Sequence, residues 1–106
     1  MSVNELTARI RAFADARDWG VYHTPKNLAM ALAGEVGELL AELQWLTPEE
    51  AGAVMEDQEA ADRIRGELAD VTIYLVRLAD VLGVDLVETS HAKLDQNELR
   101  FPRSVR

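Results

Sequence analysis

Hydrophobic residues recur along this chain at intervals of three and four positions, which is the spacing of one face of an α-helix. In the first segment this spacing makes one apolar stripe of Leu6, Ile10, Phe13 and Ala14. No stretch alternates convincingly between apolar and polar residues at every second position, as a half-buried strand does. The pattern therefore predicts an all-α fold.

Residues that start and stop helices divide this pattern into elements. Ser2 and Glu5 have the spacing of a capping box, and Pro25 suits the first turn of a helix. Gly20 and Gly83 are placed as helix stops. In chain order the predicted elements are a helix from Ser2 to Gly20, a helix from Lys26 to about Trp45, a short segment from Thr47 to about Met55, a helix that follows the acidic stretch 56–62 and ends near Leu82, and a helix from Asp85 to about Arg100.

Four main helices of these lengths can pack as an antiparallel four-helix bundle. The chain has 106 residues and shows neither internal repeats nor linkers, so we expect a single domain over residues 1–106. A bundle of this size has a thin core, and a second copy of the chain can cover the apolar faces that it leaves. We therefore expect a homo-oligomer.

Composition and charge exclude several classes of function. The net charge of −8 argues against a nucleic-acid partner, because duplex binders need Lys and Arg to replace phosphate counterions. The absence of cysteine excludes disulfides and thiol nucleophiles. The segment from Met1 to Arg11 has no secretory pattern, and no run approaches about 18 apolar residues. We expect a soluble, cytoplasmic protein with no membrane partner.

Two pairs of carboxylates, each spaced three apart, interrupt otherwise apolar runs: Glu35 with Glu38, and Glu67 with Asp70. Each pair shares one helix face and borders the apolar stripe of its own helix. If the two helices pack antiparallel, the four acids can converge on one cleft, where a cation must offset their repulsion. Oxygen ligands suit Mg²⁺ or Mn²⁺. The alternative is two amphipathic helices with acidic outer edges, and the spacing alone leaves both interpretations open.

A second metal motif is weaker. Glu88 and His91 match the Glu-x-x-His step of carboxylate-bridged di-iron bundles, but those sites need two such steps and this chain has one. We therefore interpret His91 as a surface histidine.

At the carboxylates the chain resembles a known family. Glu35-Val-Gly-Glu38 followed by Glu67-Leu-Ala-Asp70 resembles the E-x-x-E…E-x-x-D signature of the all-α nucleoside triphosphate pyrophosphohydrolases, the MazG-like superfamily. The resemblance covers the chain from about Trp19 to Pro102 and is greatest to the dCTP pyrophosphatase branch. The other segments that carry it are Tyr22-His23-Thr24-Pro25-Lys26-Asn27-Leu28, Gln44-Trp45, Asp70-Val-Thr-Ile-Tyr-Leu75, Lys93-Leu-Asp-Gln-Asn97 and Arg100-Phe101-Pro102.

This resemblance implies Mg²⁺-dependent hydrolysis of a nucleoside triphosphate between the α and β phosphates, with dCTP or a modified dNTP as substrate. The products would be the monophosphate and pyrophosphate, and the role would be housecleaning of the nucleotide pool. The metal ligands that the resemblance implies are Glu35, Glu38, Glu67 and Asp70. Glu38, from the same pair as Glu35, would help to deprotonate the attacking water. The resemblance also implies a dimer or a tetramer built from dimers.

Trp19, His23 and Trp45 would line the nucleobase pocket by the same resemblance, since aromatic faces stack on any base. From the sequence alone either tryptophan could equally be a core residue. Phe101 stands where related chains can carry tyrosine, so the preferred base stays open.

Donors for the phosphates would come from the last helix, where Lys93, Asn97 and Arg100 lie at i, i+4 and i+7 and so share a face. Tyr74, one turn beyond Asp70, would hydrogen-bond a phosphate or sugar oxygen. The alternatives are a solvated basic edge and a buried tyrosine with a satisfied hydroxyl. For the whole chain, the alternative to an enzyme is a non-catalytic helical oligomer that binds a nucleotide or a protein partner.

Overall fold

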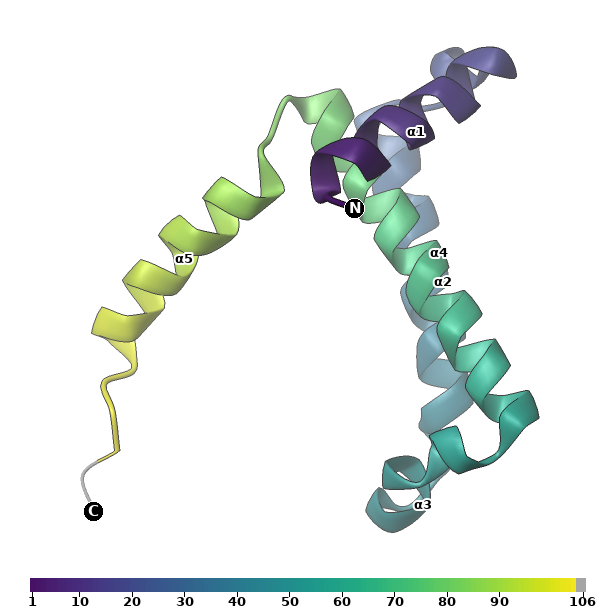
Figure 1. The fold of residues 1–106 in the computed structure, drawn as a ribbon, viewed down its shortest axis with the longest axis vertical. Helices are drawn as coiled ribbons and strands as arrows, with labels where there is room; N and C mark the ends of the chain where they lie inside the picture. Colours follow the sequence, from purple (N-terminus) through teal and green to yellow (C-terminus); the bar gives the residue numbers. More distant parts are fainter. Residues whose placement is uncertain (105–106) are drawn as a thin grey trace.

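The computed structural model describes residues 1–104, and within that range all regular structure is helical, which confirms the predicted all-α fold. None of the helices within this range has the length and hydropathy that a bilayer crossing would require. Positions 105 and 106 of the predicted domain lie outside the described residues. The elements shown in Figure 1 are α1 (Val3–Ala16), η1 (Trp19–Val21), α2 (Pro25–Leu43), α3 (Pro48–Gly52), η2 (Val54–Glu56), α4 (Gln58–Leu82) and α5 (Leu86–Arg100).

The helix starts are set by short-range hydrogen bonds. The Ser2 hydroxyl accepts a hydrogen bond from the Glu5 N–H at 3.1 Å and caps α1. The Thr24 hydroxyl accepts one from the Asn27 N–H at 3.2 Å, with Pro25 in the first turn of α2. These donors would otherwise lack a partner inside the helix, so the capping residues fix where each helix begins.

One of the two predicted glycine stops is correct. Gly83 ends α4 with a φ of 71°, in the left-handed region that glycine adopts without a Cβ clash. The prediction that Gly20 ends the first helix is wrong, because α1 ends at Ala16 and Gly20 lies inside η1. The left-handed residue at that turn is Asp18, with a φ of 56°. Aspartate tolerates this conformation better than most residues, so the chain turns two positions earlier than expected.

The long helices α2 and α4 pack side by side and antiparallel (Figure 1). Glu42, near the end of α2, forms an ion pair with Arg63, near the start of α4, at 3.0 Å. At the opposite end of the pair, His23 precedes α2 and accepts a hydrogen bond from Arg77 of α4. Helix α1 packs against α4 near its C-terminal end. The buried apolar residues are Ile10, Ala14, Leu28, Ala60, Ala61, Ile64, Val76 and Ala79.

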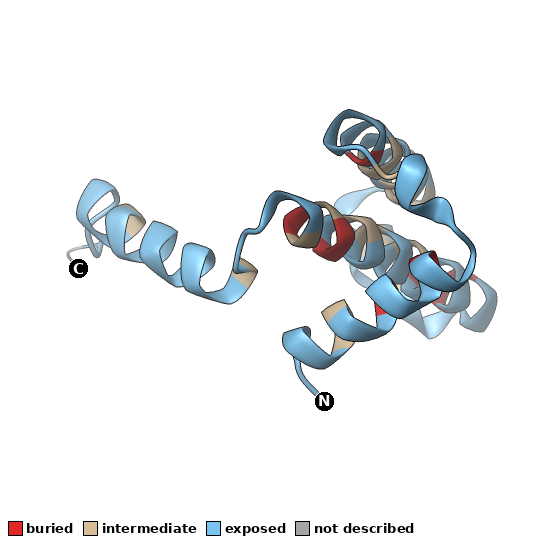
Figure 2. Ribbon diagram, turned by 90° about the horizontal axis from the view of Figure 1, so that it is seen from above, coloured by how far each residue is buried: buried red, intermediate tan, exposed pale blue. Residues whose placement is uncertain are grey.

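Helix α5 extends away from the α2–α4 pair (Figure 1), and Figure 2 shows it exposed along most of its length. None of its residues is buried, and Leu99 is 88% exposed. The radius of gyration is 17.0 Å, whereas a compact chain of this length has about 13 Å. The expected four-helix bundle is therefore not closed by the single chain, because within residues 1–104 α5 does not pack against the other helices.

A second apolar surface without a partner lies on α2. Met30 and Leu40 are 59% and 55% exposed, and a Cβ added at Gly37 would meet no atom within 4 Å. Helical periodicity puts these three positions on the side of α2 opposite the buried Leu28. One face of α2 thus holds α4, and the other presents apolar side chains to solvent.

Candidate functional site

Three carboxylates from two helices meet near the middle of the α2–α4 pair. Glu35 comes from α2, and Glu67 and Asp70 come from α4. One oxygen of each carboxylate lies within 4.8 Å of an oxygen of each of the others. Glu35 and Glu67 are partly buried, whereas Asp70 is exposed. Among residues 1–104 this is the one group of three or more side chains placed to hold a metal ion.

The core of the helix pair brings these acids together. Leu28 is 1% exposed and lies two turns before Glu35 on the same face of α2. Ile64 is buried and lies one turn before Glu67 on α4. Burial of the apolar residues between the helices therefore draws the neighbouring acids toward the same seam.

Glu67 carries the clearest sign of an incomplete site. Its Oε2 atom is buried and has no hydrogen-bond partner among the described residues. Burial raises the pKa of the Glu67 carboxyl above its ordinary value, and the negative charges of Glu35 and Asp70 raise it further. A buried carboxylate oxygen without a partner is unfavourable unless a proton or a cation joins it. A set of carboxylate donors alone fits a hard divalent cation such as Mg²⁺ or Mn²⁺.

Glu38, the fourth predicted ligand, lies outside this group of three. It is exposed, one turn along α2 from Glu35, and its charge also contributes to the raised pKa of Glu67. One turn further, Glu42 accepts hydrogen bonds from Arg63 at 3.0 and 3.2 Å. The line of acids on α2 therefore has three different environments: Glu35 faces α4, Glu38 faces water, and Glu42 is paired with an arginine.

Two of the predicted base-contacting residues lie together at the N-terminal end of α2. The ring centroids of Trp19 and His23 are 6.0 Å apart, with the planes tilted by 59°. Trp19 also packs against Phe13 of α1 in an edge-to-face arrangement, at 5.5 Å between centroids. Trp19 remains 41% exposed, so part of its ring is open to a ligand.

Trp45 lies beyond the opposite end of α2 and is 86% exposed. Helix α2 has 19 residues, so it spans about 28 Å at 1.5 Å per residue. A single chain therefore separates Trp45 from the Trp19–His23 pair. That these three residues line one pocket therefore stays a prediction. Within a single chain they lie too far apart to form a shared pocket.

The predicted phosphate donors lie on α5, away from the carboxylates (Figure 1). Lys93 and Arg100 are exposed, and Asn97 is partly buried. The Arg100 guanidinium lies 5.0 Å from the centre of the Phe101 ring. Tyr74 is partly buried on α4, one turn beyond Asp70. Of these residues, the chain by itself places only Tyr74 next to the acids.

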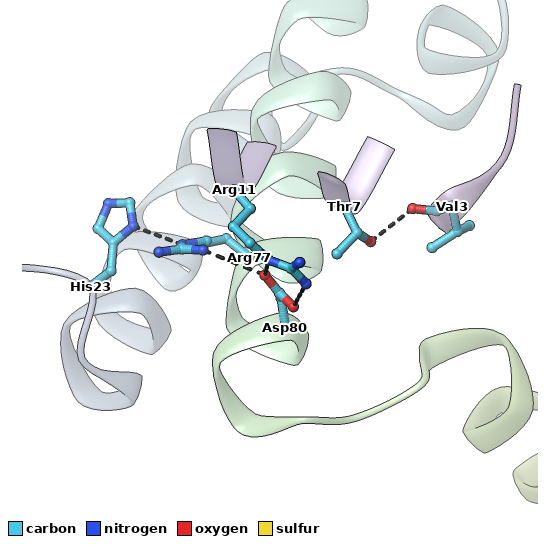
Figure 3. A network of polar contacts seen from close by, with 6 residues as sticks. All are labelled: Val3, Thr7, Arg11, His23, Arg77 and Asp80. Atoms are coloured by element: carbon cyan, nitrogen blue, oxygen red, sulfur yellow. Dashed lines mark hydrogen bonds and ion pairs between the residues drawn. The ribbon is translucent and has the colours of Figure 1, made fainter. Parts of the chain in front are cut away.

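The structure shows a polar network around His23 whose other members, Arg77, Asp80 and Arg11, were given no function in the sequence analysis (Figure 3). The Arg77 side chain is 8% exposed, and its Nε donates a hydrogen bond to His23 Nδ1 at 3.0 Å. Its Nη1 lies 3.5 Å from Asp80, which also accepts hydrogen bonds from Arg11 at 2.6 and 2.9 Å. The signal in the sequence was a lone arginine within the apolar run 71–79.

This network acts on the charge of His23. Partial burial lowers the pKa of the His23 imidazole, and the positive charge of Arg77 lowers it further. The hydrogen bonds from Arg11 lower the pKa of Asp80, and the charges of Arg11 and Arg77 lower it further, against the opposing effect of burial. Because its pKa is lowered, the His23 imidazole stays neutral down to a lower pH than an ordinary histidine does.

Glu88 and His91 both lie exposed on α5. The Glu88 N–H donates to the Asp85 carboxylate at 3.0 Å, which is the contact of a helix cap. Neither residue belongs to the one group of potential metal ligands within residues 1–104. These positions agree with the interpretation of His91 as a surface histidine.

Comparison with known proteins supports the resemblance drawn from the motifs. The model of the MazG-like family matches residues 31–104. The dCTP pyrophosphatases 1 of Bos taurus and Homo sapiens are 43% and 44% identical to this chain over 90 residues, which cover 85% of the chain and 53% of each relative. The chain thus spans about half the length of the curated relatives that it matches.

A solved structure supports the fold. A pyrophosphatase from Archaeoglobus fulgidus superimposes on this chain with a TM-score of 0.87 and 40% sequence identity. The match covers 94% of this chain and 92% of the archaeal one. Because the family model also covers most of the sequence, including all four predicted carboxylates, we conclude that this chain belongs to the MazG-like family.

Proposed function

We propose that this chain is a Mg²⁺-dependent nucleoside triphosphate pyrophosphohydrolase, with dCTP or a modified dNTP as substrate. It would cleave the bond between the α and β phosphates and release the monophosphate and pyrophosphate, as a housecleaning step in the cytoplasmic nucleotide pool. Residues 1–106 would act as a single MazG-like unit. The observation that carries the proposal is the convergence of three carboxylates on the unpartnered Glu67 oxygen, in a chain similar to dCTP pyrophosphatases.

The carboxylates would have two roles. Glu35, Glu67 and Asp70 would hold Mg²⁺, with Glu38 joining them or acting from beside them. A bound Mg²⁺ would neutralise the phosphates of the substrate and stabilise the charge that develops on them. Glu38 faces water at the edge of the group, so its carboxylate would accept the proton of the attacking water.

Substrate contacts would come from both ends of the helix pair. Trp19 and His23 would contact the base, and Tyr74 would reach a phosphate or sugar oxygen near the acids. The remaining predicted contacts are Trp45, Lys93, Asn97 and Arg100. In one chain α2 separates Trp45 from the Trp19–His23 pair, and α5 holds the other three away from the acids.

Assembly of two or more copies would resolve this separation, so we propose a homo-oligomer, either a dimer or a tetramer. The exposed apolar face of α2, with Met30, Gly37 and Leu40, and the exposed apolar residues of α5 support the proposal. Covering such surfaces is favourable by about 25 cal/mol per Å² of apolar area removed from water. A second copy would also complete the four-helix packing that a single chain leaves open.

The test is to incubate the purified chain with canonical and modified nucleoside triphosphates, in Mg²⁺ and in EDTA, and to resolve the products. We expect monophosphate and pyrophosphate in Mg²⁺ and neither in EDTA. Diphosphate with orthophosphate would overturn the assigned bond, and nucleotide binding without turnover would favour the non-catalytic oligomer.

A matched pair of variants links the activity to the site. Glu67→Gln removes one charge from the carboxylate group, and turnover is expected to be lost. Glu98→Gln makes the same change at an exposed position of α5 and is expected to leave turnover unchanged. Equal activity in the two variants would remove the carboxylate group from the mechanism.

A further inference from the structure

The state of the His23 ring is fixed by the residue that it contacts. An arginine side chain carries five N–H donors and no acceptor, and it does not lose its proton in proteins. Arg77 Nε lies 3.0 Å from His23 Nδ1, so this ring nitrogen must accept the hydrogen bond and cannot carry a proton. In a neutral imidazole the proton then sits on the other nitrogen, Nε2.

The direction of the free N–H follows from the geometry of the ring. Nδ1 faces Arg77, and Nε2 points away from it (Figure 3). Trp19 lies next to the same ring, at 6.0 Å between centroids, and is partly exposed. The two side chains therefore combine an aromatic face with one N–H donor of known position.

The Arg77 side chain is held by Asp80 as well as by its contact with His23. Asp80 lies within 3.5 Å of Arg77 and accepts two hydrogen bonds from Arg11. The charged group in contact with His23 is thus Arg77 on α4, and behind it lie Asp80 on α4 and Arg11 on α1. Arg77 is buried to 8% exposure, so its guanidinium has little freedom to turn away from the ring.

We propose that Arg77 is a positioning residue that holds His23 as the Nε2–H tautomer, so that the subsite beside Trp19 presents a fixed hydrogen-bond donor to a carbonyl oxygen of the nucleobase. This inference rests on the proposed function, in which His23 contacts the base. A ring held in this way donates to a keto oxygen and gives no acceptor to an exocyclic amino group. The network would thus select which edge of the base enters the subsite.

The first test reads the ring directly and needs no activity. The chain has two histidines, so long-range proton–nitrogen correlation spectra resolve His23 and the exposed His91. In the wild-type chain we expect His23 to carry its proton on Nε2 and to titrate below the ordinary pKa of histidine. A proton on Nδ1, or titration of His23 at or above that ordinary value, would overturn the proposal.

Variants separate the role of Arg77 from general packing. In Arg77→Met, His23 is expected to become a mixture of tautomers and to titrate at higher pH than in the wild-type chain, because the positive charge of Arg77 is gone. Arg65→Met, an exposed arginine of α4 that pairs with Asp62, is the matched control and should leave His23 unchanged. If Arg77→Met does not fold, Arg77→Gln tests the same contact, because an amide can donate or accept a hydrogen bond and so no longer fixes the tautomer of His23. Unchanged His23 signals in a folded Arg77→Met or Arg77→Gln variant would overturn the proposal.

The second test measures enzyme kinetics and asks whether Arg77 affects only the contact with the nucleobase. Arg77→Met is expected to raise KM for the preferred dNTP about three- to tenfold, the effect of one lost hydrogen bond, with little change in kcat. KM for deoxyribose triphosphate, which has no base, should stay the same, and an equal rise with this substrate would overturn the base assignment. If the wild-type chain hydrolyses no nucleotide, the proposed function and the base specificity fail together, whereas the spectra still decide whether Arg77 holds His23.

Discussion

Glu35 and Glu67 face each other across the seam between α2 and α4, with carboxylate oxygens within 4.8 Å of one another. The packing of buried residues such as Leu28 and Ile64 holds the two helices, and so the backbones of these acids, at this separation. Because one oxygen of Glu67 is buried without a partner, this proximity opposes the charged state of the site in the absence of a cation. A bound divalent cation would turn the same proximity into a stabilising arrangement.

Mg²⁺ is expected to raise the Tm of the protein, and to raise it more as the pH increases. The raised pKa of Glu67 means that the folded, metal-free chain keeps a proton on this group at pH values above its ordinary pKa of 4.5, where the unfolded chain has lost it. Stability without metal therefore falls as the pH rises through the raised pKa. Mg²⁺ competes with that proton and binds better at higher pH. Thermal unfolding in Mg²⁺ and in EDTA, at several pH values, measures both effects.

Glu67→Gln provides the control for this linkage. The substitution removes the buried charge, so the variant is expected to be more stable than the wild type in EDTA and to lose the Mg²⁺ effect. Glu98→Gln should keep the wild-type response. A Mg²⁺ shift that survives in Glu67→Gln would contradict the assignment of Glu67 as a ligand.

Glu38→Gln is expected to separate catalysis from metal binding. Glu38 lies outside the group of three carboxylates, so most of the Mg²⁺ stabilisation should remain. If its carboxylate takes the proton of the attacking water, turnover should fall by about 10²-fold or more. Glu42→Gln, one turn along α2, removes an acid that is already paired with Arg63 and should keep its turnover. Full activity of Glu38→Gln would remove Glu38 from the reaction.

Features that depend on neighbouring residues were predictable from the sequence. The α2 start at Thr24 and Pro25 and the α4 stop at Gly83 follow from hydrogen bonds and backbone preferences within one helical turn. The meeting of Glu35 with the acids of α4 was one of two interpretations that the spacing left open, because apolar periodicity limits which helix faces meet but does not decide whether acids beside the apolar stripe turn toward the partner helix or toward water. The end of α1 was missed, since Asp18 adopts a conformation that glycine usually takes.

Features that depend on distant residues were not predictable in the same way. Arg77 and His23 are separated by 54 positions, and periodicity shows that Arg77 lies on a helix face without showing which polar atom meets it. The hydrophobic periodicity also could not predict where α5 lies relative to the other helices. The apolar residues of α5 predict that it packs against something, but the pattern does not say whether the covering surface belongs to the same chain.

Acid stability is expected to depend on the contact between Arg11 and Asp80. The pKa of Asp80 is held below its ordinary value of 3.8, chiefly by the hydrogen bonds from Arg11. A depressed carboxyl pKa contributes stability that is present above the ordinary pKa and is lost as the pH falls through the depressed value. Arg11→Met should therefore move the midpoint of acid unfolding, followed by circular dichroism, to higher pH. Arg9→Met, another exposed arginine of α1, is the matched control, and equal midpoints in the two variants would contradict the prediction.

The oligomeric state can be tested on the exposed face of α2. Light scattering of the wild-type chain is expected to give the mass of two or four copies, because the apolar faces of α2 and α5 have no cover within one chain. Leu40→Glu places a charge on the α2 face and is expected to reduce the mass to that of one copy. Burial of an unpaired charge at an interface is strongly unfavourable, whereas the same charge is harmless in water.

The matched control and the linked activity complete this prediction. Met55→Glu introduces the same charge at a 45% exposed residue of η2, outside both apolar faces, and should keep the wild-type mass. If the second copy supplies α5 and its Lys93 to the acids, turnover in Leu40→Glu should fall together with the mass. The Mg²⁺ effect on Tm should remain, because the three carboxylates come from α2 and α4 of one chain. A wild-type chain that is monomeric and fully active would show that the separated contacts are not needed.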